Sequence, residues 1–233
     1  MRNYVIINGV NSSTKNGLAI KELPPITKPL MRTNIETIDG KDGDVITKLG
    51  YSAYDKEMEI GLYGNYDINS IISFFNQNGT IVFSNEPDKY YYFEILNQID
   101  YQKLIKFGSA TVVFHCQPFK YKLNETAINL SVGENTVANA GNIYAKPTLA
   151  ITGSGTIEVF LGEVEIFNID LGEGSSIVID TNKLEAYNPT DNSLMNRQVI
   201  GDYDVFKLNS GNNTITLAGT ITAATISNYT RWL

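Results

Sequence analysis

The stretch SATVVFHCQPFKY, residues 109–121, has a clear strand pattern and contains two residue types that occur nowhere else in the chain. Its first part alternates between faces as a half-buried β-strand does. The face predicted to be buried holds Ala110, Val112, Phe114 and Cys116. His115 and Cys116 are the only histidine and the only cysteine in the chain, and as strand neighbours they point in opposite directions. The pair therefore forms neither a thiolate–imidazole dyad nor a shared zinc site, and we predict that Cys116 is a core residue.

Most of the remaining chain predicts strands as well. Short runs rich in Val, Ile, Thr, Tyr and Phe are interrupted by Gly, Asn and Asp about every 8–12 residues, which favours sandwiches or barrels. Residues 67–79 are the exception, because apolar residues recur there at helical spacing. These residues are Ile68, Ile71, Ile72 and Phe75. With Asp67 as N-cap and Gly79 just beyond the end, we predict one amphipathic helix of about ten residues, the only substantial helix of the chain.

A β-hairpin is predicted directly after this helix. Residues 80–83 and 89–95 are rich in strand-forming residues, and the turn SNEPD at 84–88 separates them. In the second strand Tyr90 and Tyr92 face one way, whereas Tyr91 and Phe93 face the other. Two interpretations remain open: a strand buried on both faces within one chain, or a strand with one face in a subunit interface, where aromatic residues are enriched.

The length of 233 residues suits two domains. Regular alternation is lost between residues 117 and 137, and beyond that point glycine turns are frequent, the first of them predicted at Gly153-Ser154-Gly155. We therefore predict a mainly β protein with an N-terminal domain, residues 1–125, and a C-terminal domain, residues 126–233. The first is expected to be a sandwich or barrel-like domain with one short helix, and the second a sandwich without a helix.

Charge and hydropathy exclude several classes of protein. The net charge is −7, with −1 in residues 1–120 and −6 in residues 121–233, so the chain lacks the clustered cations that nucleic-acid binding requires. The longest apolar runs are far shorter than the roughly 18 residues of a membrane span, and the first residues do not resemble a secretion signal. We expect a protein that is made in a reducing cytoplasm, without membrane insertion or nucleic-acid specificity.

The chain also lacks the patterns of an enzyme or a metal protein. The stretch DGKDGD, residues 39–44, has the composition of a calcium loop, but either register lacks the glutamate that ends such a loop. A turn between two strands explains its glycines. Glu158, Glu163 and Glu165 alternate with apolar residues, which indicates a solvated strand face rather than a pair of catalytic carboxyls. We therefore expect no catalytic activity, no metal and no cofactor.

The order of several features along the chain resembles the phage distal tail protein (Dit) family. In the first half these features are Asn8-Gly9, Gly17-Leu18, the segment from Ile38 to Asp44, Asn78-Gly79, the strand DKYYY at 88–92 and FHCQPF at 114–119. In the second half they are NAGN at 139–142, Lys146-Pro147, Gly153, Asp180, GNN at 211–213 and Arg231-Trp232. Lys41 departs from the family pattern, which has arginine there and thus a planar fork for carboxylates.

This resemblance implies a hub of a siphophage-type baseplate at the tail tip of a virion or prophage. Its N-terminal domains would form a homo-hexameric ring, and its C-terminal domain would be a galectin-like or carbohydrate-module-like sandwich. The implied partners are the tail tube protein and the tail-tip (tail-associated) protein, with tape-measure and receptor-binding proteins as further ones. The protein would be made in the bacterial host cytoplasm.

We expect the subunit interface to use a hairpin near residues 36–50 and the tyrosine-rich strand. Its candidate residues are Ile38, Asp39, Lys41, Asp42, Asp44, Tyr90, Tyr91 and Tyr92. A carbohydrate-binding sandwich for adhesion to the host surface is the alternative function, and Trp232 would then be a sugar platform rather than a core residue. An enzyme that uses Glu158 or Glu163 is a third.

Overall fold

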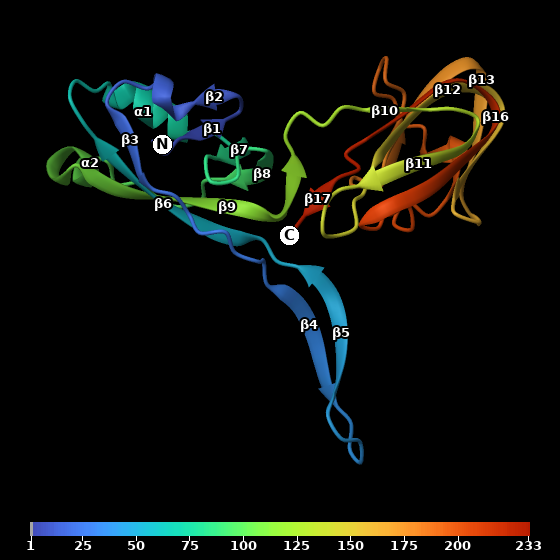
Figure 1. Ribbon diagram of the computed structural model, residues 1–233, viewed down its shortest axis with the longest axis horizontal. Helices are drawn as coiled ribbons and strands as arrows, with labels where there is room; N and C mark the ends of the chain where they lie inside the picture. Colours follow the sequence, from blue (N-terminus) through green and yellow to red (C-terminus); the bar gives the residue numbers. More distant parts are fainter. Residues whose placement is uncertain (1) are drawn as a thin grey trace. The chain divides into compact units, whose positions relative to one another are not determined.

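The computed structural model describes residues 2–233 and divides into two compact units, one ending at Leu123 and the other comprising Asn124–Trp232 (Figure 1). Strands account for 55% of the chain and helices for 9%, so the predicted mainly β class is confirmed. None of the helices in residues 2–233 combines the length and the apolar character needed to span a membrane.

The first unit contains most of its strands in one sheet, and a pair of strands forms a second one. Its elements are β1 (Val5–Ile7), β2 (Val10–Asn11), the 3₁₀ helix η1 (Ser12–Thr14), β3 (Leu18–Glu22), β4 (Met31–Thr37), β5 (Asp44–Tyr51), β6 (Tyr54–Leu62), α1 (Ile68–Phe75), β7 (Gly79–Phe83), β8 (Lys89–Glu94), α2 (Tyr101–Phe107) and β9 (Ser109–Lys122). The main sheet has the order β2-β1-β7-β8-β9-β6-β3, and β4 pairs with β5 in a separate antiparallel ribbon.

The predicted helix is present as α1, and it covers the main sheet. The side chain of Asp67 accepts hydrogen bonds from the backbone N–H groups of Asn69 (3.1 Å) and Ser70 (3.2 Å), which is the expected N-cap. Phe75 of α1 contacts Phe114 of β9, with ring centroids 6.5 Å apart. Phe114 also contacts Phe83 and Phe93 at 5.8 and 5.3 Å. The core of the first unit is therefore centred on the strand that the alternating pattern identified.

The expectation of a single helix is wrong, because the first unit contains a second one, α2. The side chain of Asp100 caps it by accepting a hydrogen bond from the N–H of Lys103 (2.8 Å). Gly108 ends it in the left-handed conformation, with φ +66°, which glycine adopts without steric cost. Leu104 is its only fully buried residue. With seven residues and one strong core contact, α2 has too short an apolar pattern to be distinguished from a loop by periodicity.

The second unit is built from three very long strands. Its elements are β10 (Ile128–Leu130), β11 (Gly133–Asn139), β12 (Thr148–Leu161), β13 (Val164–Asp180), β14 (Glu185–Tyr187), the 3₁₀ helix η2 (Asn196–Gln198), β15 (Val199–Gly201), β16 (Gly211–Ser227) and β17 (Arg231–Trp232). One half of each long strand lies in a layer with the strand order β10-β16-β12-β13-β14. The other half of each long strand lies in a layer whose edge strands are β11, paired with β16, and β15, paired with β13. Each long strand thus contributes to two layers.

Glycines within the long strands mark the change from one layer to the other. The register of β12 shifts near Gly153 and Gly155, and the pairing of β12 with β16 shifts between Ser154 and Glu158. A Cβ atom at Gly153 would lie 2.3 Å from the carbonyl oxygen of Thr220. The sequence interpretation of Gly153 and Gly155 as a turn between separate strands is therefore wrong. They are bends inside continuous strands, which is how β-bulges and glycine fold a sheet over itself.

Candidate assembly surface

His115 and Cys116 lie on opposite faces of β9, so the two side chains do not form a joint site. Cys116 is fully buried in the first core, and burial raises the pKa of its thiol to about 12. His115 lies on the opposite face of β9, where its Nδ1 atom is 2.8 Å from Oδ1 of Asp55 on the paired strand β6. Within residues 2–233, no group of three or more His, Cys, Asp or Glu side chains is arranged to hold a metal ion.

The strongest polar cluster of the first unit is buried and structural. Glu86, in the β7–β8 turn, accepts a hydrogen bond from Nζ of Lys120 at 2.8 Å and another from the hydroxyl of Tyr91. Burial, together with the hydrogen bond to Glu86, raises the pKa of Tyr91 beyond its ordinary range. The tyrosine therefore stays a proton donor. Since both carboxylate oxygens have buried partners, this cluster ties the turn to β8 and β9.

A second buried lysine connects this cluster to the segment before β4. Lys56 is 3% exposed, and its Nζ atom donates a hydrogen bond of 3.0 Å to the carbonyl oxygen of Pro25. The same atom lies 4.9 Å from the ring centroid of Tyr91, a favourable cation–π distance. Burial lowers the pKa of Lys56. Asn85 donates to the carbonyl oxygen of Pro24 at 3.0 Å, so two side chains hold the proline connector that leads into β4.

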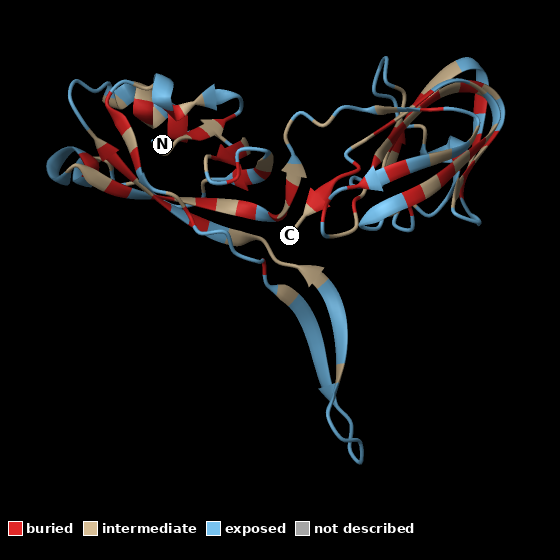
Figure 2. Cartoon of the chain, in the orientation of Figure 1, coloured by how far each residue is buried: buried red, intermediate tan, exposed pale blue. Residues whose placement is uncertain are grey.

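That connector supports the β4–β5 ribbon, which we call the arm (residues 31–51). Figure 1 shows the arm extending away from the body of the first unit, and Figure 2 shows that it is exposed along nearly its whole length. Ile35 and Ile46 lie directly opposite each other and are 57% and 59% exposed. An isolated two-stranded ribbon is at best marginally stable in water. Such a ribbon with exposed isoleucines is typical of a segment that another chain covers.

Five of the predicted interface residues gather at the tip of the arm. They are Ile38, Asp39, Lys41, Asp42 and Asp44. All five are exposed, and Ile38 is 49% exposed. The N–H of Lys41 donates to the carbonyl oxygen of Ile38 at 3.1 Å, and Gly40 and Gly43 have positive φ angles of +80° and +77°. The tip is thus a turn, as its sequence predicts, and it presents one apolar and several charged side chains to solvent.

The tyrosine-rich strand β8 is not buried on both faces within the unit. Tyr92 is 43% exposed, whereas Tyr91 is 0% exposed. The inclusion of Tyr91 among interface residues is therefore wrong, since its ring belongs to the core and its hydroxyl to the Glu86 cluster. Tyr92 packs with Tyr90 and with Tyr121 of β9, at ring-centroid distances of 5.5 and 5.3 Å. Tyr90 and Tyr92 stay predicted interface residues.

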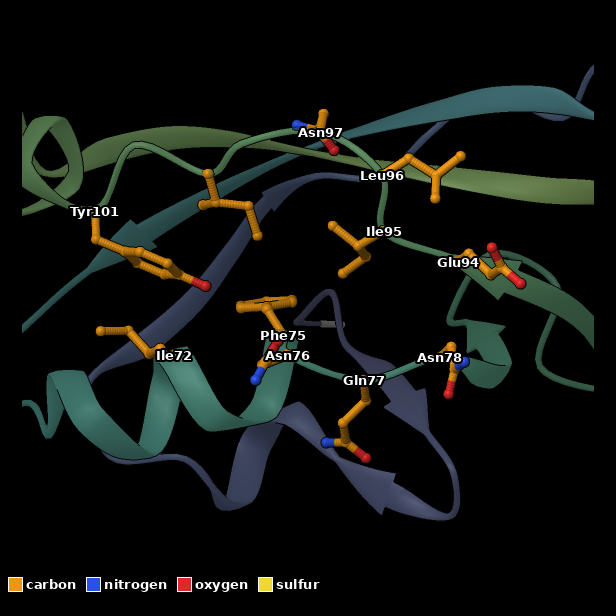
Figure 3. Close-up of a pocket in the computed structure, with 11 residues that line it drawn as sticks. Ile72, Phe75, Asn76, Gln77, Asn78, Glu94, Ile95, Leu96, Asn97 and Tyr101 are labelled. Atoms are coloured by element: carbon orange, nitrogen blue, oxygen red, sulfur yellow. The ribbon is translucent and has the colours of Figure 1, made fainter.

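Sequence reasoning missed a second exposed apolar surface, around α2. Leu96, Ile105 and Phe107 are 70%, 49% and 76% exposed. Beside them lies a depression of about 550 Å³ between α1, the end of β8 and the start of α2 (Figure 3). Amide, aliphatic and aromatic side chains line it, among them Asn78, Ile99 and Tyr101, together with the carboxylate of Glu94. Glu94 is the one carboxylate among the residues that line this depression.

Comparison with solved structures identifies the fold. The crystal structure of the SPP1 Dit protein, described as a paradigm of hub adsorption apparatus in phages that infect Gram-positive bacteria, matches this chain with a TM-score of 0.73 at 18% identity. The match covers 100% of both chains. This chain has the Dit fold. Structures of the phage P2 baseplate in its activated conformation, with calcium and with strontium, match this chain with TM-scores of 0.51 and 0.52 at 13% identity.

The two baseplate matches cover 97% of this chain and 97% and 96% of the matched chains. No protein-family model matches the sequence, and no curated protein sequence matches it either. At such low identity the Dit fold is recognisable through the order of elements rather than through individual residues. The predicted resemblance to this fold is confirmed.

Proposed function

We propose that this chain is a structural hub of a phage or prophage tail tip. Copies of it would form a hexameric ring that joins the tail tube to the tail-tip or receptor-binding apparatus. The observation that carries the proposal is the match to a phage hub protein over the full length of both chains. The structural neighbours are baseplate proteins rather than enzymes, which supports a non-catalytic role.

Ring formation is assigned to residues 1–125, because the first unit carries the exposed arm and the exposed face of β8. Residues 126–233 are assigned to a separate sandwich domain. The arm tip, together with Tyr90 and Tyr92, is the proposed subunit interface. A ring contact joins two different surfaces of the same chain, so one exposed ribbon needs one complementary surface on a neighbouring copy.

The further partners follow from this position in the virion. A hub between tube and tip would contact the tail tube protein on one side and the tail-tip (tail-associated) protein on the other. Tape-measure and receptor-binding proteins are the additional proposed partners. The protein would be made in the cytoplasm of the bacterial host and would reside in the tail tip of the virion.

Light scattering and negative-stain electron microscopy of the purified chain test the proposal. The expected result at micromolar concentration is a ring with a mass well above the 25.8 kDa of one chain. A variant in which a short Gly/Ser linker replaces residues 31–51 should remain folded but monomeric, since the arm pairs only with itself among the described strands. A monodisperse monomer with no rings, for the unmodified chain, would contradict the proposed function.

A further inference from the structure

The arm tip carries a strong local charge that its own chain leaves uncompensated. Residues 36–44 contain four acidic residues and one lysine, a net charge of −3 over nine positions. Glu36 and Asp44 accept hydrogen bonds from neighbouring arm side chains, Asn34 (2.7 Å) and Thr37 (3.3 Å). Among residues 2–233, no ion pair involves Asp39 or Asp42. The tip therefore combines an exposed isoleucine, Ile38, with unneutralised carboxylates.

The outer surface of α2 has the opposite character. Lys106 and Phe107 lie three and four residues after Lys103 along the helix, so these three side chains share one face. All three side chains are exposed. We call this set the α2 face.

Two carboxylates of the first unit, at the start of α2 and on β6, already have hydrogen-bond partners. Asp100 caps the helix. Glu59 of β6 accepts hydrogen bonds from Ser109 and Lys21, and the hydrogen bond from Ser109 is the main reason that its pKa is lowered, with the field of Lys103 as a smaller contribution. No ion pair in the described part of the chain involves Lys103 or Lys106. The face thus offers cations beside a large exposed aromatic ring.

We propose that the arm tip of one copy docks on the α2 face of a neighbouring copy. The two surfaces match in both components, because Ile38 can pack on Phe107 while Asp39 and Asp42 approach Lys103 and Lys106. They lie at separate ends of the first unit, so the contact joins two molecules rather than closing within one (Figure 1). This inference rests on the proposed ring and names the surface that receives the arm.

A contact between two different patches of one chain is heterologous, and such contacts produce a ring when the rotation closes. In such a ring each chain would supply its arm to one neighbour and its α2 face to the other, so no arm would remain exposed. It would also cover the side chain of Phe107, which is 76% exposed in the single chain.

Site-directed cross-linking of the full chain tests this contact. Lys41→Cys at the tip and Gln102→Cys on α2 introduce thiols at exposed positions outside the proposed contacts, and the native Cys116 is buried and protected. A short bismaleimide should link neighbouring subunits of this double variant into covalent multimers. The matched control pairs Lys41→Cys with Asn16→Cys, an exposed position after η1, and should give only a background level of linking.

Charge exchange between the two surfaces provides a second test. Adding Lys103→Glu and Lys106→Glu to the cross-linking variant should weaken linking about tenfold, because two attractions become repulsions. Further addition of Asp39→Lys and Asp42→Lys should restore it. Rings that form without linking above the control level, or without rescue by the exchanged charges, would overturn the docking site and leave the hub proposal intact. Absence of rings would overturn both.

Discussion

At the scale of single residues, Gly219 shows how one position allows a strand to serve two layers. Its φ angle is +114°, and a Cβ atom there would lie 2.5 Å from the carbonyl oxygen of Thr156. Gly219→Ala should destabilise the protein by roughly 1–3 kcal/mol, since it adds backbone strain to a clash with neighbouring main chain. Gly172→Ala is the control, because its Cβ would meet only the hydroxyl of Ser175, at 3.3 Å. Urea denaturation, followed by circular dichroism, measures the loss of stability in both variants. Equal losses would show that the bend does not require glycine at position 219.

The buried thiol of Cys116 makes a second prediction at this scale. Its pKa is about 12 in the folded chain and 9.0 as the reference value. A raised pKa means that the folded state keeps the proton longer than the unfolded state, so stability is lost as the pH rises above 9.0. At pH 10 the loss from this group is about 1.4 kcal/mol.

Urea denaturation at pH 8 and pH 10 tests the linkage. Cys116→Ala removes the titrating group, so its stability should fall less between the two pH values than that of the unmodified chain. Its lower absolute stability, caused by lost packing, does not affect this difference. Equal falls for the two proteins would show that the thiol contributes nothing to the alkaline loss.

At the scale of elements, the β7–β8 turn depends on the buried Glu86 cluster. The Glu86 and Lys120 side chains are 9% and 6% exposed, so Glu86→Ala leaves a buried lysine without its counter-charge. The expected cost is about 3–5 kcal/mol. Asp88 forms an ion pair with Lys89 in the same turn but is 66% exposed, so Asp88→Ala should cost about 1 kcal/mol or less. Chemical denaturation compares the two variants, and similar costs would mean that the cluster is not the anchor of the turn.

The same turn shows how far the sequence determines what can be predicted. The hairpin, helix α1 and strand β9 follow from local patterns: turn residues, helical spacing and strict alternation. The Glu86 cluster does not, because Lys56, Glu86, Tyr91 and Lys120 come from four separate elements or turns and no local pattern distinguishes a buried lysine from an exposed one. Their juxtaposition depends on sheet order, which a single sequence does not encode in its periodicity.

Other elements were missed because their signals have two meanings. Asp100 and Gly108 mark the ends of α2, but a seven-residue helix differs little from a capped turn, so neither its existence nor its exposed Phe107 followed from the pattern. In the second unit, glycine indicates both turns and bends within strands. The arm was predicted as a hairpin because its tip has turn chemistry, whereas its lack of a third strand is visible only in three dimensions.

At the scale of the whole molecule, the two separate cores lead us to predict two independent folding units. One cluster of buried side chains lies within the first unit and the other within the second, and the two clusters have no residue in common. Residues 1–125 and 126–233, expressed separately, should therefore each fold with a cooperative thermal transition. Since the arm and the α2 face both belong to the first fragment, that fragment alone should form rings. The second fragment should remain monomeric.

Native mass spectrometry measures the oligomeric state of each fragment, and circular dichroism confirms that each fragment is folded. A folded first fragment that stays monomeric while the full chain forms rings would place part of the interface in residues 126–233 and contradict the assignment of the ring to the first unit. Ring formation by the first fragment, lost when a short linker replaces residues 31–51, would make the arm the element on which assembly depends. The second unit could then vary in sequence without altering the ring, because none of its residues would contribute to ring closure.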